Sequence, residues 1–159
     1  MKIRIGQGID FHRLENGLNL WLGGVNIPSE KGCVAHSDGD VLIHAICDAL
    51  LGAAGLRDIG YYFPDTSIEF KNIDSKILLR KTFGLIREKG FNVINIDSTV
   101  CLEKPKISSS IPEMRDVISK LLDTEPDNIS IKATTTEKLG FTGREEGIIA
   151  IAVVLITKT

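Results

Sequence analysis

The fold of this 159-residue chain is decided by one stretch, Ala35–Gly55, which reads AHSDGDVLIHAICDALLGAAG. From Asp40 onward most of its residues favour an α-helix, and either of the two glycines near its end can terminate one. Ser37 or Asp38 can cap the first turn, and acidic side chains suit the positive end of a helix. The stretch therefore predicts a capped helix that begins close to Asp40.

The same stretch carries two of the three histidines of the chain and three carboxylates. His44 and Asp48 are four residues apart, so they lie on one face of the predicted helix. A carboxylate often orients a metal-ligating histidine in this way. The alternative is a capped helix with a partly buried, hydrogen-bonded histidine, and this segment alone leaves both interpretations open.

The length and composition are those of one ordinary globular domain, residues 1–159. Hydrophobic residues make up 43% of the chain and charged residues 25%, which allows a proper core beneath a polar surface. The formal net charge is −2 and there is no basic block, which argues against nucleic acid or an anionic membrane as a partner. Any anionic substrate must therefore be held by local donors or by a metal.

The cysteines indicate a reducing compartment. Cys33, Cys47 and Cys101 are odd in number and widely spaced, so neither a disulfide framework nor a four-thiolate zinc site is expected. The first residues lack the long apolar core of a signal peptide. The longest apolar run, Ile148–Ile156, is too short to span a bilayer as a helix. We therefore expect a cytoplasmic protein.

Periodicity along the chain predicts both strands and helices. Strands are expected at residues 2–12, 91–102, 128–134 and 148–156, further helices at 75–89 and 112–123, and a short hairpin at 18–28. The continuous β-branched run 148–156 predicts a strand covered on both faces, whereas Ser29–Gly32 is expected to be a loop. Gly6 and Gly8 predict a close backbone approach or a bulge. We expect an α+β fold with a mixed four-stranded sheet and helices on one face.

Asp10 and His12 are two residues apart on the first predicted strand, so their side chains project from the same face. Together with His36 and His44 they are candidate metal ligands. Two histidines and one carboxylate form a set that catalytic zinc sites use, with a fourth position open to water or substrate. The same set suits non-haem iron, and an isolated Asp-x-His pair is more often structural.

Thr134, Thr135 and Thr136, followed by Glu137, offer hydroxyl donors and a carboxylate at the end of a predicted strand. Such a segment can hold phosphate oxygens, Glu137 can ligate Mg²⁺, and Arg144 can add a bidentate phosphate contact. A threonine run alone is more often simple β-strand propensity. The sequence has no Walker loop, dinucleotide-binding glycine pattern or hydrolase nucleophile motif. Metal-assisted phosphoryl chemistry is therefore the favoured class.

An aromatic-rich loop, Arg57–Thr66, follows the first predicted helix and is punctuated by Gly, Pro and Asp. Long ordered loops are often functional, so the loop is a candidate lid or substrate wall. The alternative is a hydrophobic cluster that lies beneath a loop.

Seven short motifs extend in order from residue 6 to residue 144. They are Gly6-x-Gly8-x-Asp10-x-His12, His36-Ser37-Asp38-Gly39-Asp40 with His44, Asp58-Ile59-Gly60, Phe63-Pro64-Asp65, Pro105-Lys106, Ile111-Pro112-x-Met114-Arg115 and Lys132–Arg144. In this order they resemble the 2-C-methyl-D-erythritol 2,4-cyclodiphosphate synthase family over nearly the whole chain. The histidine segment and the block Ala133–Arg144 are the most specific parts of the resemblance.

The resemblance implies a lyase of the non-mevalonate route to isoprenoid precursors. The substrate would be 4-diphosphocytidyl-2-C-methyl-D-erythritol 2-phosphate. Its 2-phosphate would attack the β-phosphorus of the diphosphate, close a cyclic diphosphate and expel CMP. Asp10, His12 and His44 would bind Zn²⁺ or another divalent metal, and Glu137 would ligate Mg²⁺ or Mn²⁺.

The resemblance also implies the residues that surround the substrate. His36 and Thr135 would stabilise the transition state, and Asp58 and Gly60 would hold the erythritol. The full set of implied substrate contacts is Asp10, His12, His36, Ser37, Asp58, Ile59, Gly60, Phe63, Pro64, Asp65, Thr66, Ser67, Leu102, Glu103, Lys104, Pro105, Lys106, Ile107, Ser108, Thr134, Thr135, Thr136, Glu137, Phe141 and Arg144. Within this set, the run 102–108 and the three threonines would cradle the cytidine and its phosphates.

Members of this family are homotrimers with active sites between subunits, so the resemblance implies a homotrimer. One chain would supply the zinc side of each site, and its neighbour would supply the cytidine side. Two other interpretations remain open. The first is another zinc phosphohydrolase built on the same ligands. The second is a non-enzymatic, isoprenoid-binding trimer in which the metal only staples the helix to the strand.

Overall fold

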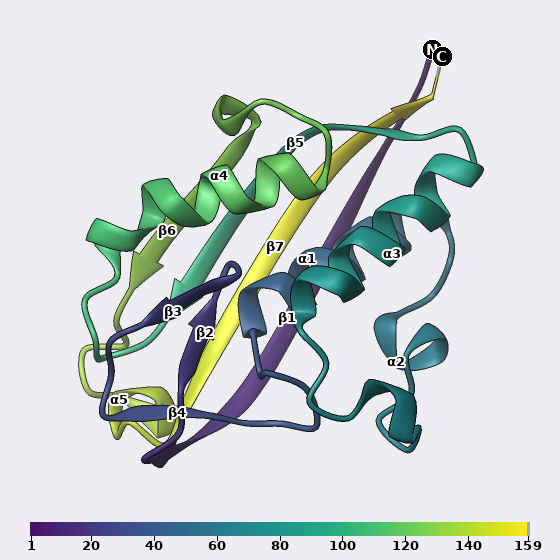
Figure 1. The fold of residues 1–159 in the computed structure, drawn as a ribbon. Helices are drawn as coiled ribbons and strands as arrows, with labels where there is room; N and C mark the ends of the chain where they lie inside the picture. The colour runs from purple at the N-terminus through teal and green to yellow at the C-terminus, as the bar shows by residue number, and fades with distance from the viewer. Residues whose placement is uncertain (159) are drawn as a thin grey trace.

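The computed structural model describes residues 1–158, which form a single α+β domain around a five-stranded sheet (Figure 1). The strands lie in the order β4-β1-β7-β5-β6. β5 and β6 run parallel, whereas the other neighbouring strands are antiparallel, so the predicted mixed sheet is confirmed. The strands span Lys2–Asn16 (β1), Lys31–Val34 (β4), Asn92–Cys101 (β5), Ile129–Thr134 (β6) and Gly147–Lys158 (β7).

The prediction of four strands is wrong, because β4 is a fifth strand at the edge of the sheet. β4 includes the second half of the segment expected to be a loop, and it pairs with the end of β1, from Arg13 to Asn16. Two features hid it in the sequence. The strand is only four residues long and contains Gly32, and its partner lies beyond residue 12, where the first strand was expected to end.

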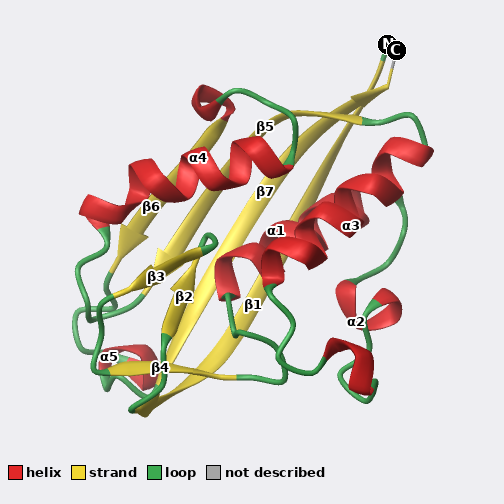
Figure 2. Cartoon of the chain, in the orientation of Figure 1, coloured by secondary structure: helices red, strands yellow, loops and turns green. Residues whose placement is uncertain are grey.

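Three long helices lie on one face of the sheet, as expected (Figure 2). They are α1 (Val41–Ala54), α3 (Ser75–Glu88) and α4 (Ile111–Leu121). The shorter elements are β2 (Leu20–Leu22), β3 (Val25–Ile27), α2 (Ile59–Tyr62), α5 (Gly140–Gly143) and the 3₁₀ turns Ile68–Phe70, Ser108–Ser110 and Pro126–Asn128. Within the described part of the chain, no helix has both the length and the apolar character needed to cross a membrane.

Asp40 is the residue that caps α1, in place of the expected Ser37 or Asp38. Its carboxylate accepts hydrogen bonds from the backbone N–H of Ile43 and of both glycines in the turn between β2 and β3, at 2.6–3.0 Å. Burial raises the pKa of Asp40, although the hydrogen bonds from the backbone oppose the rise. Asp40 therefore joins the start of α1 to the small hairpin, and Gly55 ends the helix in a left-handed conformation.

Gly6 and Gly8 allow β1 to lie directly against α1. A Cβ atom at Gly6 would lie 2.0 Å from the carbonyl oxygen of Ala49, and one at Gly8 would lie 2.0 Å from that of Ala45. The predicted close backbone approach is thus confirmed. Because strand side chains alternate, Asp10 shares the face of these glycines and points toward α1.

The opposite face of the sheet is apolar and lies open in the single chain. Six large side chains on β1 and β7 are between 36% and 70% exposed there. They are Ile3, Ile5, Ile9, Phe11, Ile151 and Val153. Within one chain, therefore, only one face of β7 is covered, whereas the sequence predicted cover on both. An apolar area of this kind on a sheet marks an interaction surface.

Candidate active site

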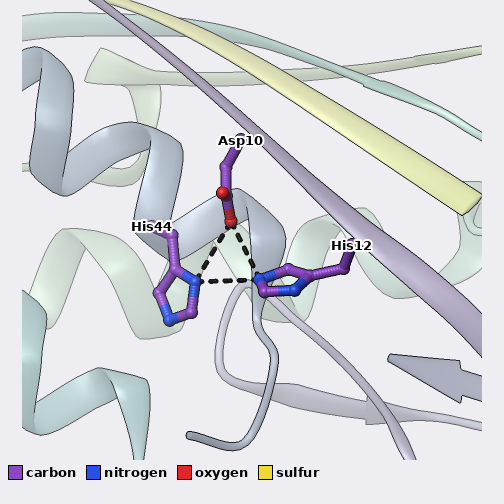
Figure 3. A group of neighbouring side chains, drawn as sticks. All are labelled: Asp10, His12 and His44. Carbon is purple, nitrogen blue, oxygen red and sulfur yellow. Dashed lines mark hydrogen bonds and ion pairs between the residues drawn. The ribbon is translucent and has the colours of Figure 1, made fainter. Parts of the chain in front are cut away.

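Three potential metal ligands from two elements meet at one point (Figure 3). β1 supplies Asp10 and His12, and the first turn of α1 supplies His44. Asp10 Oδ2 lies 3.0 Å from His12 Nε2 and 3.1 Å from His44 Nδ1. The two ring nitrogens are 3.2 Å apart. The close packing of β1 on α1 is what brings these side chains together, although they are 32 residues apart in sequence.

A backbone carbonyl orients the ring of His12. Its Nδ1 lies 3.2 Å from the carbonyl oxygen of Val34 at the end of β4. Because a carbonyl can only accept, this Nδ1 must carry the proton, and Nε2 is left with its lone pair toward Asp10 and His44. The edge strand missed by the sequence therefore leaves Nε2 of His12 available to a metal ion.

His44 is buried, and its two ring nitrogens face different partners. Nδ1 faces Asp10, while Nε2 lies 2.9 Å from the hydroxyl of Ser75 and 3.2 Å from that of Ser37. The expectation that Asp48 orients this ring is wrong. The carboxylate of Asp48 instead accepts the backbone N–H of Ile59 at 2.8 Å and holds the start of α2.

The electrostatics of the three residues favour a bound cation. Burial by itself would raise the pKa of Asp10, but His12 and His44 outweigh this effect and hold it well below its usual range. Burial alone would lower the pKa of His44, but the hydrogen bond and negative charge of Asp10 raise it. Asp10 therefore stays ionised, as a metal-ligating carboxylate must be.

The donor atoms fit a divalent metal ion. Zinc bonds of about 2.0–2.2 Å in a tetrahedron place neighbouring donors about 3.3 Å apart. The three observed separations of 3.0–3.2 Å are close to this value. A carboxylate with two imidazoles, and a side open toward a cavity, is the donor chemistry of a catalytic rather than a closed structural site.

A cavity of about 340 Å³ opens above these ligands. Its walls come from the loop before α1, from α2 and from the segment that leads to α3. The residues that line it are Asp10, His12, Ala35, His36, Ser37, His44, Ile59, Gly60, Phe63, Asp65, Phe70, Ile73 and Leu78. Most residues implied for the zinc and erythritol side therefore lie around one space, and the aromatic loop forms one of its walls.

Four residues of this group, Asp58, Pro64, Thr66 and Ser67, are not among those that line the cavity. Asp58 caps α2, and its Oδ1 accepts the backbone N–H of Tyr61 at 3.0 Å. The ring of His36 lies 3.2 Å from the carbonyl oxygen of Ser67. Pro64 and Thr66 flank Asp65 but do not line the cavity.

A second cavity, of about 260 Å³, lies where β5 and β6 end. It shares no lining residue with the first cavity. Its lining residues are Leu102, Glu103, Pro105, Lys106, Ile107, Ser108, Ala133, Thr134 and Thr135. Most residues implied for the cytidine side are thus gathered around one space as well. Within the same chain, this space is separate from the metal triangle, the group formed by Asp10, His12 and His44.

Glu103 has a role that the sequence did not indicate. Its Oε1 accepts the backbone N–H of Thr136 and of Lys138, each at 3.1 Å. These bonds hold the polar loop that follows β6. Lys104 lies outside the second cavity and forms an ion pair with Glu145 at 3.2 Å.

The last predicted contacts lie beyond this loop. Arg144 forms a bidentate ion pair with Glu146 at 2.9 and 3.0 Å. The ring of Phe141 lies 6.4 Å from that of Phe11 on the open face of the sheet. Among the described residues, Glu137 belongs to no group of three potential metal ligands.

Comparison with known proteins decides the family. The YgbB family model matches residues 3–157. The 2-C-methyl-D-erythritol 2,4-cyclodiphosphate synthase of Phocaeicola vulgatus is 63% identical over 158 residues, which are 99% of each chain. The synthase of Bacteroides fragilis is 61% identical with the same coverage. The chain belongs to this synthase family. It is therefore an enzyme of the lyase type.

A solved structure of such a synthase in its CDP-bound form has the same fold. It is 39% identical to this chain, with a TM-score of 0.90 over 97% of this chain and 100% of the other. The likeness therefore extends over the entire synthase domain.

Sequence reasoning missed two residues that matter for this member of the synthase family. The carbonyl of Val34 orients His12, and the hydroxyl of Ser75 contacts His44. No sequence pattern could reveal the role of Val34, because it acts through its backbone carbonyl, a group that every residue has. The second had a weak signal, since a serine at the start of a predicted helix is ordinarily assigned to capping.

Proposed function

We propose that this enzyme converts 4-diphosphocytidyl-2-C-methyl-D-erythritol 2-phosphate to 2-C-methyl-D-erythritol 2,4-cyclodiphosphate and CMP, and that it requires a divalent metal. The observation that carries the proposal is the triangle of Asp10, His12 and His44 at the floor of a cavity. In the reaction an oxygen of the 2-phosphate forms a bond to the β-phosphorus. The bond from the β-phosphorus to the bridging oxygen breaks, and CMP leaves with that oxygen.

Both reacting phosphates belong to one substrate, so the protein has to position them and needs no covalent intermediate. We assign Zn²⁺, or another divalent ion, to the triangle, where it would withdraw charge from the phosphate oxygens. His36 and Ser37, which line the same cavity, would contact the phosphates, and the hydroxyl of Ser37 would donate a hydrogen bond to them. Such donors also offset the repulsion between two anionic groups that must approach each other.

The erythritol would occupy the part of the cavity next to α2. The residues that we assign to it are Asp58, Ile59, Gly60, Phe63, Pro64, Asp65, Thr66 and Ser67. Asp48 supports this assignment, because its hydrogen bond to the N–H of Ile59 fixes α2 relative to the metal-ligating helix.

We place the cytidine and its phosphates at the second cavity, with Glu137 as the ligand of Mg²⁺ or Mn²⁺. Relatives of known structure hold CDP, which supports a nucleotide substrate. Thr135 belongs to this second side, whereas His36 lines the first cavity. Within one chain the proposed pair of transition-state residues thus belongs to two separate cavities, and we assign the two members of each pair to different chains.

A homotrimer with sites between subunits resolves this separation. The open apolar face of β1 and β7 is the surface that a neighbouring copy would cover. Phe141, which packs beside Phe11, lies next to that face. We place the enzyme in the cytoplasm, which is consistent with its three free cysteines.

Shared sites make a sharp prediction for mixed trimers. His12→Ala removes the metal side and Thr135→Ala removes the nucleotide side, so each variant alone should lack activity. Random co-assembly should restore about a quarter of the sites, because each site takes one half from each of two neighbours. Activity is measured after both variants are unfolded and refolded together. A mixture that stays inactive, although it has the mass of a trimer, would contradict sites between chains.

The function is tested by product analysis with the diphosphocytidyl substrate and added Zn²⁺ and Mg²⁺. The products are measured by ³¹P NMR. We expect one equivalent of cyclic diphosphate for each CMP released, and no inorganic phosphate. Release of inorganic phosphate without ring closure would instead identify a zinc phosphohydrolase. Chelation of the metals should stop the reaction, and Zn²⁺ with Mg²⁺ should restore it.

A further inference from the structure

The hydroxyl of Ser75 is buried between the ring of His44 and the carboxylate of Asp38, which lie 31 and 37 residues before it in the sequence. Ser75 is the first residue of α3 and is 0% exposed. Its oxygen lies 2.9 Å from Nε2 of His44, on the side of the ring that faces away from Asp10. The same hydroxyl donates a hydrogen bond to Oδ1 of Asp38. A chain of three groups therefore leads from the carboxylate to the imidazole.

The carboxylate of Asp38 is itself held in place. Oδ2 accepts the backbone N–H of Ser75 at 2.8 Å, and Oδ1 accepts the backbone N–H of Asp40 at 3.1 Å. The backbone N–H of Asp38 donates to the carbonyl oxygen of Ile73 at 3.1 Å. These contacts join the loop before α1 to the start of α3, so the carboxylate cannot turn away from Ser75 without breaking them.

The direction of the hydrogen bonds follows from what each group can donate. An ionised carboxylate only accepts, so the single proton of the Ser75 hydroxyl is committed to Asp38. The oxygen of Ser75 can then only accept from His44, which requires a proton on Nε2. The lone pair of the neutral ring is consequently on Nδ1, the atom that faces Asp10 and His12.

We propose that Asp38 and Ser75 are positioning residues that fix the tautomer and orientation of His44, so that Nδ1 is ready to bind the metal. This inference rests on the metal site assigned under the proposed function. Such partners of a ligating histidine raise its basicity and restrict its rotation. Without them, the carboxylate of Asp10 would draw the ring proton onto Nδ1, where it blocks the metal.

Neither of two other polar side chains near His44 in the sequence, Asp48 and Ser37, can replace this pair. Asp48 is engaged with the N–H of Ile59. Ser37 lies farther from Nε2, at 3.2 Å, and already accepts the N–H of Gly39. Its own proton is free to point toward His44, so it does not determine which ring nitrogen is protonated.

The test compares Ser75→Ala with Ser119→Ala. Ser119 is also buried, but its hydroxyl donates to a carbonyl within α4. Zinc affinity is measured by competition with a chromogenic chelator. We expect Ser75→Ala to bind zinc about 10- to 100-fold more weakly, the usual effect of losing such a partner, whereas Ser119→Ala should match the parent. Equal affinity in Ser75→Ala and the parent would overturn the proposal, as would an equal loss in both variants.

A second readout needs no metal. The ¹⁵N shifts of His44 in the metal-free protein at alkaline pH report which ring nitrogen is protonated. We expect Nε2–H in the parent and in Ser119→Ala, and a shift toward Nδ1–H in Ser75→Ala. Asp38→Asn should shift the ring in the same direction, because the relay loses its acceptor-only end. An unchanged tautomer in both relay variants would overturn the proposal. Failure of the parent to bind zinc would refute the metal site instead, while the tautomer would still decide the relay.

Discussion

His12→Ala should abolish turnover and zinc binding while the fold remains intact. The side chain supplies one of the three proposed ligands, and a metal ion contributes several kcal/mol to a phosphoryl-transfer transition state. Because each 1.4 kcal/mol is a tenfold change in rate, we expect kcat/KM to fall by at least about 1,000-fold. The measurement combines CMP release, the zinc content of the purified protein and circular dichroism.

The fold should survive because the core does not depend on the metal. α1 is held by fully buried aliphatic residues along its whole length, among them Leu42, Ile46 and Leu50. His36→Ala is the matched control, since it removes the third histidine of the chain, which lines the cavity without touching the triangle. That variant should lose activity but keep its zinc. If chelation or His12→Ala melted the protein, the metal would be a structural staple and the catalytic account would fail.

Two members of the metal triangle could be placed from the sequence because local periodicity is sufficient for them. Asp10 and His12 share a strand face, and this requires nothing beyond the alternation of side chains. Their meeting with His44 was harder to foresee. Gly6 and Gly8 indicated a close approach of the backbone to another element. The partner is a helix, and its small residues, among them Ala45, do not indicate in the sequence which strand packs against them.

The parts that escaped prediction depend on contacts between distant segments. β4 forms because the end of β1 offers it an edge, so its own four residues carry little signal. Ser75 and His44 are 31 residues apart, and no local sequence pattern indicates that their side chains are in contact. The proposed pairing of the two cavities was implied by the family resemblance alone. Each cavity is built within one chain, and their proposed relation belongs to the assembly rather than to any local pattern.

Asp58→Ala should lower kcat/KM by about 100-fold or more and leave both folding and zinc affinity unchanged, because a misplaced substrate can cost that much without loss of the catalytic metal. Asp58 precedes the cavity residues Ile59 and Gly60 and uses Oδ1 to cap α2. Oδ2 can accept from a hydroxyl of the substrate. The helix has no buried residue, so loss of its cap should cost only about 1 kcal/mol of stability.

Asp58→Asn separates the cap from the substrate contact. An asparagine caps a helix about as well as an aspartate. However, its side chain is uncharged and has only one acceptor oxygen. We therefore expect Asp58→Asn to recover the stability of the parent and only part of its activity. Asp48 still holds the N–H of Ile59 in both variants, so the loop keeps its anchor on α1. Full turnover by Asp58→Ala would mean that the substrate does not lie against α2, and the assignment of the first cavity to the erythritol would then be wrong.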